Sequence, residues 1–277
     1  MPGNQAAAAA GPRQRLTAPE RSKFLSEGYC VIPFLSPPRL RAVRAAIEAR
    51  VAYEGSAGGW EGGHSGVARR LCNLFSKGDV FVDMAVESVM LEAAALSIGR
   101  GRDFIFNAMN FHDPVPGQVA RQPIHADRAF FPRCRGYFNA IIVLDAMTRD
   151  SGATRLVPRS HLQPWPNLEP RNLSAAGDHL TAEKPLADPL AAAPGEIFAE
   201  VDAGTAVLCH GDLWHGACDN RSTGTRRVIH LGFACTDTRP QYEIAATLPD
   251  MTRERLQPLI ETLAPRRNWW RVDYSSS

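Results

Sequence analysis

Short runs of β-forming residues, separated by turn residues, fill the chain after Gly101. Several strands at such close spacing are typical of an antiparallel sandwich or barrel. This pattern constrains the fold more than any other feature, because it requires a β core in the second half of the chain. The expected strands are Phe104 to Phe111, Gln122 to Ala126, Tyr137 to Leu144, Thr154 to Val157, Ile197 to Val201, Thr205 to His210, and Arg227 to Ala234.

The first hundred residues carry helix signals instead. Thr17 can cap a helix whose first turn tolerates Pro19, and Glu20 can complete a capping box. Apolar residues at helical spacing predict two more helices. The expected elements are a helix that stops at Gly28, a strand from Tyr29 to Leu35, a helix that opens at Ser36, and a helix from Val80 to Leu96.

The 277 residues indicate one domain, since β-sandwiches of this size often form a single unit. We expect a disordered tail over residues 1–16 and the domain over 17–277. Residues 163–194 are rich in Pro, Ala and Asn, which predicts a lid or mobile loop. A last helix is expected from Thr252 to Leu263.

The charge and the cysteine content indicate which binding partners and which cell compartment to expect. With 31 basic and 29 acidic residues, the net charge of +2 does not demand nucleic acid or a membrane surface. No apolar run approaches the ~20 residues of a membrane span. The six cysteines are scattered and predict reduced thiols at a cytoplasmic address. We expect a small-molecule substrate, no nucleic acid, no membrane, and a monomer or homodimer.

The pattern His125-Ala-Asp127 places two metal-ligand residues at alternate positions. On a strand, both side chains would project from one face. His215, from a distant strand, is the best third ligand. Two histidines and one carboxylate form the non-haem Fe(II) arrangement that leaves open positions for oxygen chemistry. A second His-x-Asp, at His210 and Asp212, could form a compact site with His215, but its Gly-Asp pair is typical of a turn.

Arg226 should lie on the strand that follows His215, and a hairpin there would bring its guanidinium beside the metal. The fork of donors fits a carboxylate bidentately. A metal beside a buried arginine suits a 2-oxoacid, whose keto acid end chelates iron while the far carboxylate pairs with arginine. The alternative is an ordinary surface arginine in the pair Arg226-Arg227.

Several stretches together resemble the phytanoyl-CoA dioxygenase family of Fe(II)/2-oxoglutarate oxygenases, over roughly residues 17 to 240. No single motif is specific, but their order and spacing are. The matching stretches are Arg69 to Leu74, Gln122 to Asp127, Ser151 to His161, and His215 to Ser222 running on to Arg226-Arg227.

The resemblance implies a fold that is mainly β with flanking α, with a double-stranded β-helix (jelly-roll, cupin-like) core. It implies iron on His125, Asp127 and His215, and Arg226 on the C5 carboxylate of 2-oxoglutarate. It also implies cosubstrate contacts from a further set of residues: Gln122, Thr154, and Arg70 or Asn73.

Two residues depart from the family's pattern. Arg159 stands where the family usually has Gly in a turn, and Ala217 replaces a hydroxyl residue found in some members. Asp127 is present, whereas related halogenases have a small residue there. The resemblance therefore implies hydroxylation rather than halogenation.

The implied cofactors are Fe(II), 2-oxoglutarate as cosubstrate, and O2. The implied activity is the hydroxylation of an unactivated C–H bond of a small organic molecule, in bacterial natural-product tailoring. Desaturation, epoxidation or epimerisation could occur at the same iron site. Two alternatives from other classes are a non-catalytic cupin-like binding protein and a metal-dependent hydrolase or isomerase. Candidate pocket-lining aromatic residues are Trp60, Phe106, Phe111, Phe130, Phe131, Trp165 and Trp214.

Overall fold

The computed structural model describes a discontinuous set of residues: 14–55, 59, 68–99, 102, 104–117, 122–130, 135–163 and 191–235. Three predictions fall wholly or mainly outside it, namely the tail before residue 14, most of the segment 163–194, and the last helix. At the edge of the predicted tail, Leu16 is buried and donates its backbone N–H to Glu92 at 2.9 Å.

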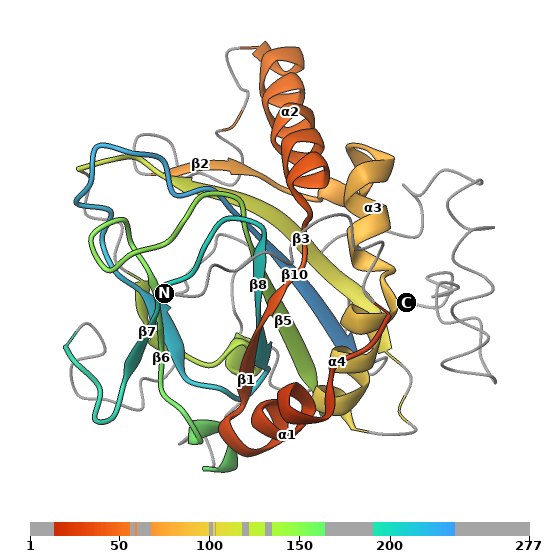
Figure 1. Cartoon of the computed structure of the whole chain (residues 1–277), viewed down its shortest axis with the longest axis vertical. Helices are drawn as coiled ribbons and strands as arrows, with labels where there is room; N and C mark the ends of the chain where they lie inside the picture. Colours follow the sequence, from red (N-terminus) through yellow and green to blue (C-terminus); the bar gives the residue numbers. More distant parts are fainter. Residues whose placement is uncertain are drawn as a thin grey trace, which may run out of the picture.

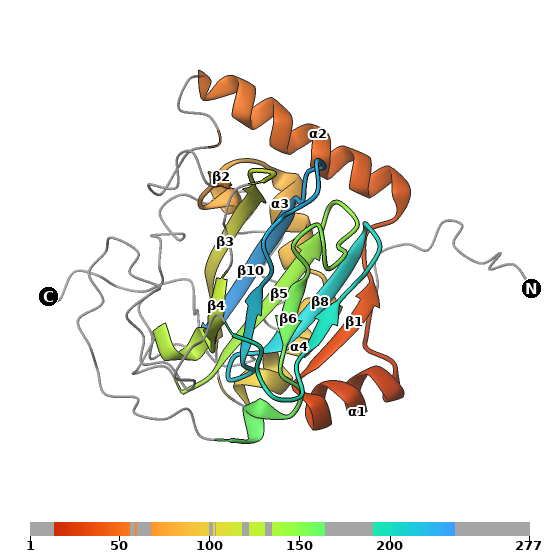
Figure 2. The ribbon, with the colours of Figure 1, turned by 90° about the vertical axis from the view of Figure 1, so that its left-hand side faces the viewer.

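Two antiparallel sheets form the centre of the molecule (Figures 1 and 2). The larger sheet has the order β1-β8-β5-β10-β3-β2, and the smaller one has the order β4-β9-β6-β7. The larger comprises β1 (Tyr29–Pro33), β8 (Thr205–His210), β5 (Tyr137–Val143), β10 (Val228–Cys235), β3 (Phe104–Pro114) and β2 (Ala68–Leu71). The smaller comprises β4 (Gln122–His125), β9 (His215–Ala217), β6 (Thr154–Leu156) and β7 (Ile197–Ala199).

Every strand expected from the β-type runs is present, and the predicted double-stranded β-helix core is confirmed. The pattern of runs missed two short strands, β2 and β9. Their sequences, Ala-Arg-Arg-Leu and His-Gly-Ala, contain no β-branched or aromatic residue, so neither stands out as a β-type run. Arg226 lies just before β10 rather than on it.

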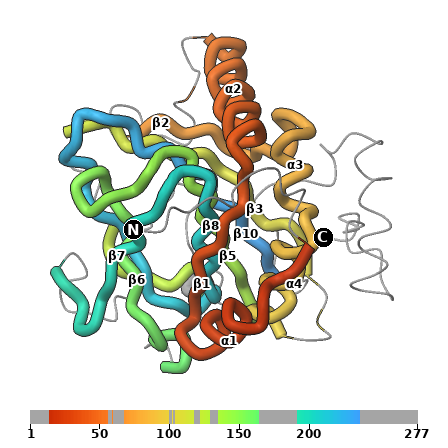
Figure 3. The backbone as a smooth tube through the Cα atoms, viewed as in Figure 1, coloured from red at the N-terminus to blue at the C-terminus, as the bar shows by residue number. Residues whose placement is uncertain are grey.

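Helices cover the outer face of the larger sheet. The elements are α1 (Ala18–Glu27), α2 (Pro37–Tyr53), α3 (Asp79–Ala85) and α4 (Ser88–Ile98), with short 3-10 turns η3 (Leu74–Ser76), η4 (Asp127–Phe130) and η5 (Ser160–Leu162). Apolar side chains of β1, β5 and β10 on this outer face pack with α4 in one buried core. Figure 3 shows β1 beside β8 after the chain leaves α1.

The single helix expected from Val80 to Leu96 is wrong. The chain forms α3 and α4, separated at Glu87, whose backbone is extended with φ −62° and ψ 134°. The carboxylate of Glu87 pairs with Arg39 of α2. Apolar periodicity continues across the break, so the sequence pattern did not reveal that a tertiary ion pair fixes a turn there.

The inner face of the larger sheet is divided into an apolar half and a polar half. Residues that stand opposite each other in register share a face. Val31, Val207 and Ile141 are apolar, and the row continues to His230 and Asn110. The next row joins Val143 and Val228 to His112 and Arg70. Polar side chains therefore gather where β10, β3 and β2 meet.

Gly28 ends α1 as the sequence predicts. Its φ of +82° is left-handed, and its N–H bonds the carbonyl of Phe24 at 3.0 Å. A Cβ at this position would come within 2.5 Å of His161 and 2.9 Å of Leu213. The turn thus needs glycine both for its backbone angle and for the close approach of η5.

Replacing Gly28 by alanine should destabilise the protein by roughly 2 kcal/mol, from left-handed strain plus overpacking. Gly117→Ala is the matched control, since Gly117 has φ +75° but no atom of the described residues within 4 Å of where a Cβ would stand. Urea denaturation of both variants measures the difference. Equal losses in the two variants would show that the contact with His161 is unimportant.

Candidate metal centre

Three predicted ligands meet at one edge of the smaller sheet. His125, the last residue of β4, pairs in register with His215, the first residue of β9. Nε2 of His125 lies 3.6 Å from Oδ1 of Asp127, and Nε2 of His215 lies 3.5 Å from Oδ2. Each residue offers one possible ligand atom, and these three atoms all lie within 4.8 Å of one another. This group of three could hold a metal ion.

Asp127 reaches the site in a different way from the one expected. It is the first residue of η4, not a strand residue two positions beyond His125 on the same face. The pairing of β4 with β9 is also irregular between Gln122 and His125. The expectation of a shared strand face was therefore wrong, although the three residues do come together, because the turn of η4 directs the carboxylate back to the histidines.

The backbone fixes which nitrogen of each histidine faces the site. Nδ1 of His125 lies 2.8 Å from the carbonyl of Pro123, and Nδ1 of His215 lies 2.9 Å from that of Leu213. A carbonyl only accepts, so each Nδ1 carries the proton and each Nε2 keeps its lone pair. This is the arrangement in which metal-binding histidines are oriented by outer partners.

Burial and charge also suit a cation here. Burial alone would raise the pKa of Asp127, but the neighbouring His215 and His125 hold it well below its usual range. Burial lowers the pKa of His215, which favours the neutral imidazole that binds metal. Oδ2 of Asp127 is buried and has no hydrogen-bond partner among the described residues. A metal ion would satisfy that oxygen.

The alternative site at His210 and Asp212 is not supported. Nδ1 of His210 accepts the backbone N–H of Asp212 at 3.1 Å, which closes a local turn. The carboxylate of Asp212 pairs with Arg128. The ring of His210 packs against Phe24 and His161. Within the described part of the chain, only His125, Asp127 and His215 form a group of three possible ligands.

Arg226 is buried, with 4% of its surface exposed, which excludes a surface position. Its guanidinium donates to Oγ1 of Thr154 at 3.3 Å, while its Nε has no hydrogen-bond partner among the described residues. Burial lowers the pKa of Arg226 to about 10. A buried arginine whose side chain meets a neutral hydroxyl is suited to receive an anion.

The other residues expected to contact a cosubstrate lie around this space. Thr154 touches Arg226, and Nε2 of Gln122 lies 3.4 Å from Nε2 of His125. Arg70 is buried on the inner face of β2. Asn73 lies outside the sheet, with a left-handed φ of 49°, and its N–H bonds the side chain of Asn110 at 3.2 Å.

Sequence reasoning missed His230. Burial and the nearby charge of Arg226 lower its pKa to about 3, and Asp127, His215 and Arg70 also act on it electrostatically. Its ring meets that of His112 with centroids 4.9 Å apart. A usable signal was present, because Arg226, Val228 and His230 alternate and should share one face of the strand.

The structure shows where the two residues that depart from the family's pattern lie. Arg159 has a left-handed φ of 67°, the conformation that explains glycine in the family. Ala217 stands opposite Gln122 and Thr154 in register.

Two of the aromatic residues expected to line a pocket lie elsewhere. Phe106 and Phe111 belong to the core beneath the helices, so they do not line the site. Trp214 packs with a small cluster around Ile124. The remaining candidates, including the side chain of Phe130, lie outside the described residues.

Comparison with known proteins agrees with this architecture. A family model described as phytanoyl-CoA dioxygenase matches residues 24–228. The dioxygenase trt7 of Aspergillus terreus is 24% identical over 206 residues, covering 70% of this chain and 64% of that protein. The chain spans between about half and two-thirds of the length of the curated relatives it matches.

Two solved structures show the same fold. The non-heme α-ketoglutarate-dependent carbocyclase SnoK from nogalamycin biosynthesis has a TM-score of 0.63 at 20% identity, covering 84% of this chain and 90% of that chain. The epimerase SnoN in complex with Fe3+, α-ketoglutarate and nogalamycin RO has a TM-score of 0.61 at 16% identity, with coverages of 84% and 88%.

Fold and site together define a jelly-roll protein with two histidines and one carboxylate placed to hold a metal. The matching family model covers most of the chain and agrees with this fold and site. The chain belongs to the phytanoyl-CoA dioxygenase family. Within the described residues, no helix is long and apolar enough to cross a bilayer.

Alanine at His125 or Asp127 should abolish stoichiometric binding of a divalent metal, since each removes one of three ligands. Alanine at His210 should leave metal binding intact, because that side chain belongs to a separate turn. Calorimetric titration with Mn²⁺ under anaerobic conditions measures all three variants. Loss of metal from the His210 variant, with retention by the His125 variant, would refute the assignment.

Stability should fall with acid partly because of His210. Burial lowers its pKa to about 4, against about 6.5 in an unfolded chain. A depressed folded pKa contributes stability above pH 6.5, and that contribution is lost as the pH falls from about 6.5 toward 4. Between pH 7.5 and 4.5, the free energy of unfolding of His210→Gln should therefore fall by on the order of 2 kcal/mol less than that of wild type. Urea denaturation of metal-free protein measures this, and parallel pH profiles would contradict it.

Proposed function

We propose that the protein is an Fe(II)- and 2-oxoglutarate-dependent dioxygenase that oxidises a C–H bond of a small organic molecule. The observation that carries the proposal is the buried guanidinium of Arg226, which meets Thr154 on the same small sheet that carries His125 and His215. A hydrolase or a simple metal-binding protein has no need of a buried cation in this place. A keto acid that binds metal at one end and arginine at the other does need it.

The residues present fit both groups. His125, Asp127 and His215 would hold Fe(II), with the uncompensated oxygen of Asp127 as one ligand atom. Three protein ligands leave three positions of an octahedron open. Bound iron and 2-oxoglutarate supply the O2-derived oxidant for C–H bonds, with the cosubstrate consumed to succinate and CO2.

The chain itself supplies position and charge. Arg226 binds the C5 carboxylate, and Thr154 holds one end of that guanidinium. Gln122 lies beside Nε2 of His125, and Arg70 lies on the inner face of β2. Both would contact the keto acid end or the substrate. Asp127 would bind the metal as a carboxylate, since a carboxyl whose pKa is ordinary or lowered is ionised at physiological pH.

Similarity to SnoK and SnoN supports a small-molecule substrate, and natural-product tailoring in particular, over a nucleic acid. Their names, carbocyclase and epimerase, also support outcomes other than hydroxylation on this core. The bacterial setting stays a prediction, since the relative trt7 comes from Aspergillus terreus. The cytoplasmic address and the monomeric or dimeric state likewise stay predictions.

Adding Fe(II) and 2-oxoglutarate to the protein without oxygen should produce a weak visible charge-transfer band. Arg226→Ala should weaken 2-oxoglutarate binding at least about tenfold, since a charge-assisted bidentate contact is lost. Arg221→Ala is the matched control, because its side chain is 75% exposed on the loop between β9 and β10. Titration of the band measures each dissociation constant. Absence of a band in iron-loaded wild type would overturn the proposal.

A further inference from the structure

The backbone at Arg226 lies outside the regular ladder of the sheet. The pairing of β10 with β3 and β5 begins at Val228. The N–H of Arg226 is instead accepted by Oδ1 of Asp113 at 3.3 Å. A side-chain carboxylate of β3 thus takes the place of a backbone acceptor, at the residue whose guanidinium meets Thr154 of the smaller sheet.

Asp113 is held from its other side as well. Oδ2 accepts from Nε of Arg69 at 3.0 Å and from a terminal nitrogen of the same guanidinium at 2.8 Å. The carboxylate is buried, with 6% of its side chain exposed. Both oxygens are engaged, one by the backbone of Arg226 and one by Arg69, so the position of Asp113 is closely defined.

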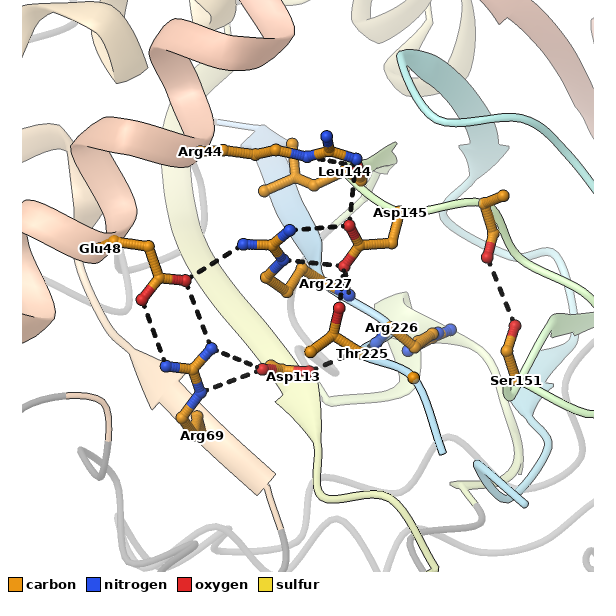
Figure 4. A network of polar contacts seen from close by, with 12 residues as sticks. Arg44, Glu48, Arg69, Asp113, Leu144, Asp145, Ser151, Thr225, Arg226 and Arg227 are labelled. Carbon is orange, nitrogen blue, oxygen red and sulfur yellow. Dashed lines mark hydrogen bonds and ion pairs between the residues drawn. The ribbon is translucent and has the colours of Figure 1, made fainter. Parts of the chain in front are cut away.

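The contacts continue to helix α2, as Figure 4 shows. Arg69 also pairs with Glu48 of α2, which in turn pairs with Arg227 at 3.1 Å. On the far side, Asp145 accepts the hydroxyl of Thr225 at 2.8 Å and the N–H of Arg227 at 3.0 Å. Asp113 therefore holds the backbone at Arg226 itself, while Asp145 holds the backbone of Arg227 and the side chain of Thr225, and α2 supports both carboxylates.

The side chain of Arg226 has much weaker support. Its guanidinium meets Thr154 at 3.3 Å, a long contact for a hydrogen bond, and its Nε has no partner among the described residues. The direction of the guanidinium consequently depends on where the backbone of residues 225–227 is held. A shift of that backbone would move the cation away from Thr154 and so from the small sheet that carries the candidate metal ligands.

We propose that Asp113 is a positioning residue for Arg226: by fixing the N–H of Arg226, it sets the reach of the guanidinium and so the preference for a keto acid with a distal carboxylate. This inference rests on the proposed function. It assigns to Asp113 no contact with the cosubstrate itself. Arg69 and Glu48 act one step further out, by holding Asp113.

The test compares two keto acids in anaerobic Fe(II) titrations of the full-length protein. 2-Oxoglutarate has the distal carboxylate that Arg226 would bind, and pyruvate lacks it. Asp113→Ala should weaken 2-oxoglutarate binding about tenfold, the usual effect of losing one charge-assisted hydrogen bond, and change pyruvate binding less than about twofold. Asp113→Asn keeps an oxygen that can accept from Arg226 and should recover most of the loss.

Glu87→Gln serves as the matched control. Glu87 is a carboxylate with a comparable exposed fraction, 5% of its side chain, and it also pairs with an arginine, Arg39. Loss of that ion pair should leave the ratio of the two keto acid affinities unchanged. Metal affinity, measured separately with Mn²⁺, should be the same in all variants that retain the three ligands.

A double-mutant cycle completes the design. If Asp113 acts through Arg226, then Asp113→Ala should cause no further loss of 2-oxoglutarate affinity in an Arg226→Ala background. Equal weakening of both keto acids, additive losses in the cycle, or unchanged binding in Asp113→Ala would overturn the inference. If Asp113→Ala does not fold, Arg69→Met, which removes the guanidinium that holds Asp113, takes its place in the same cycle. If iron-loaded wild type bound neither keto acid, that result would instead refute the proposed function, and this inference with it.

Discussion

Burial of a cation between two sheets is the constraint on which the site depends. Arg226 precedes a strand of the larger sheet and contacts Thr154 of the smaller one. An ionised group in such a place costs several kcal/mol unless it is compensated. The compensation here comes partly from Asp113 and is otherwise left to a ligand, because the guanidinium itself meets only a hydroxyl among its hydrogen-bond partners in the described residues.

The same logic shapes the metal ligands. Each imidazole is fixed by a backbone carbonyl, and the carboxylate of Asp127 keeps one buried oxygen without a hydrogen bond to any described residue. The candidate ligand atoms are therefore left available for a metal instead of being hydrogen-bonded to one another. Stability comes from elsewhere, namely from the apolar half of the inner face and from the continuous core between the larger sheet and its helices.

Much of the fold followed from local patterns. Each of the seven β-type runs after Gly101 contains a strand of the structure, and Gly28 marked the end of the first helix. The misses have physical causes. The helix break at Glu87 coincides with an ion pair to Arg39, 48 positions away, which no local periodicity records. Strands β2 and β9 lack β-branched and aromatic residues, and they pair because neighbouring strands offer them hydrogen bonds.

The sequence by itself determined the chemistry that is available: which residues can bind a metal, which cation can meet a carboxylate, and which residues must turn. Tertiary structure decided how these groups meet. Asp127 joins the histidines from a 3-10 turn instead of a strand, and His230 of β10 comes near enough to Arg226 and Asp127 for their charges to act on it. Asp113 reaches Arg226 across 113 positions of chain. The physical reason is that hydrogen bonds and burial act over a few ångströms in space, whatever the separation along the chain.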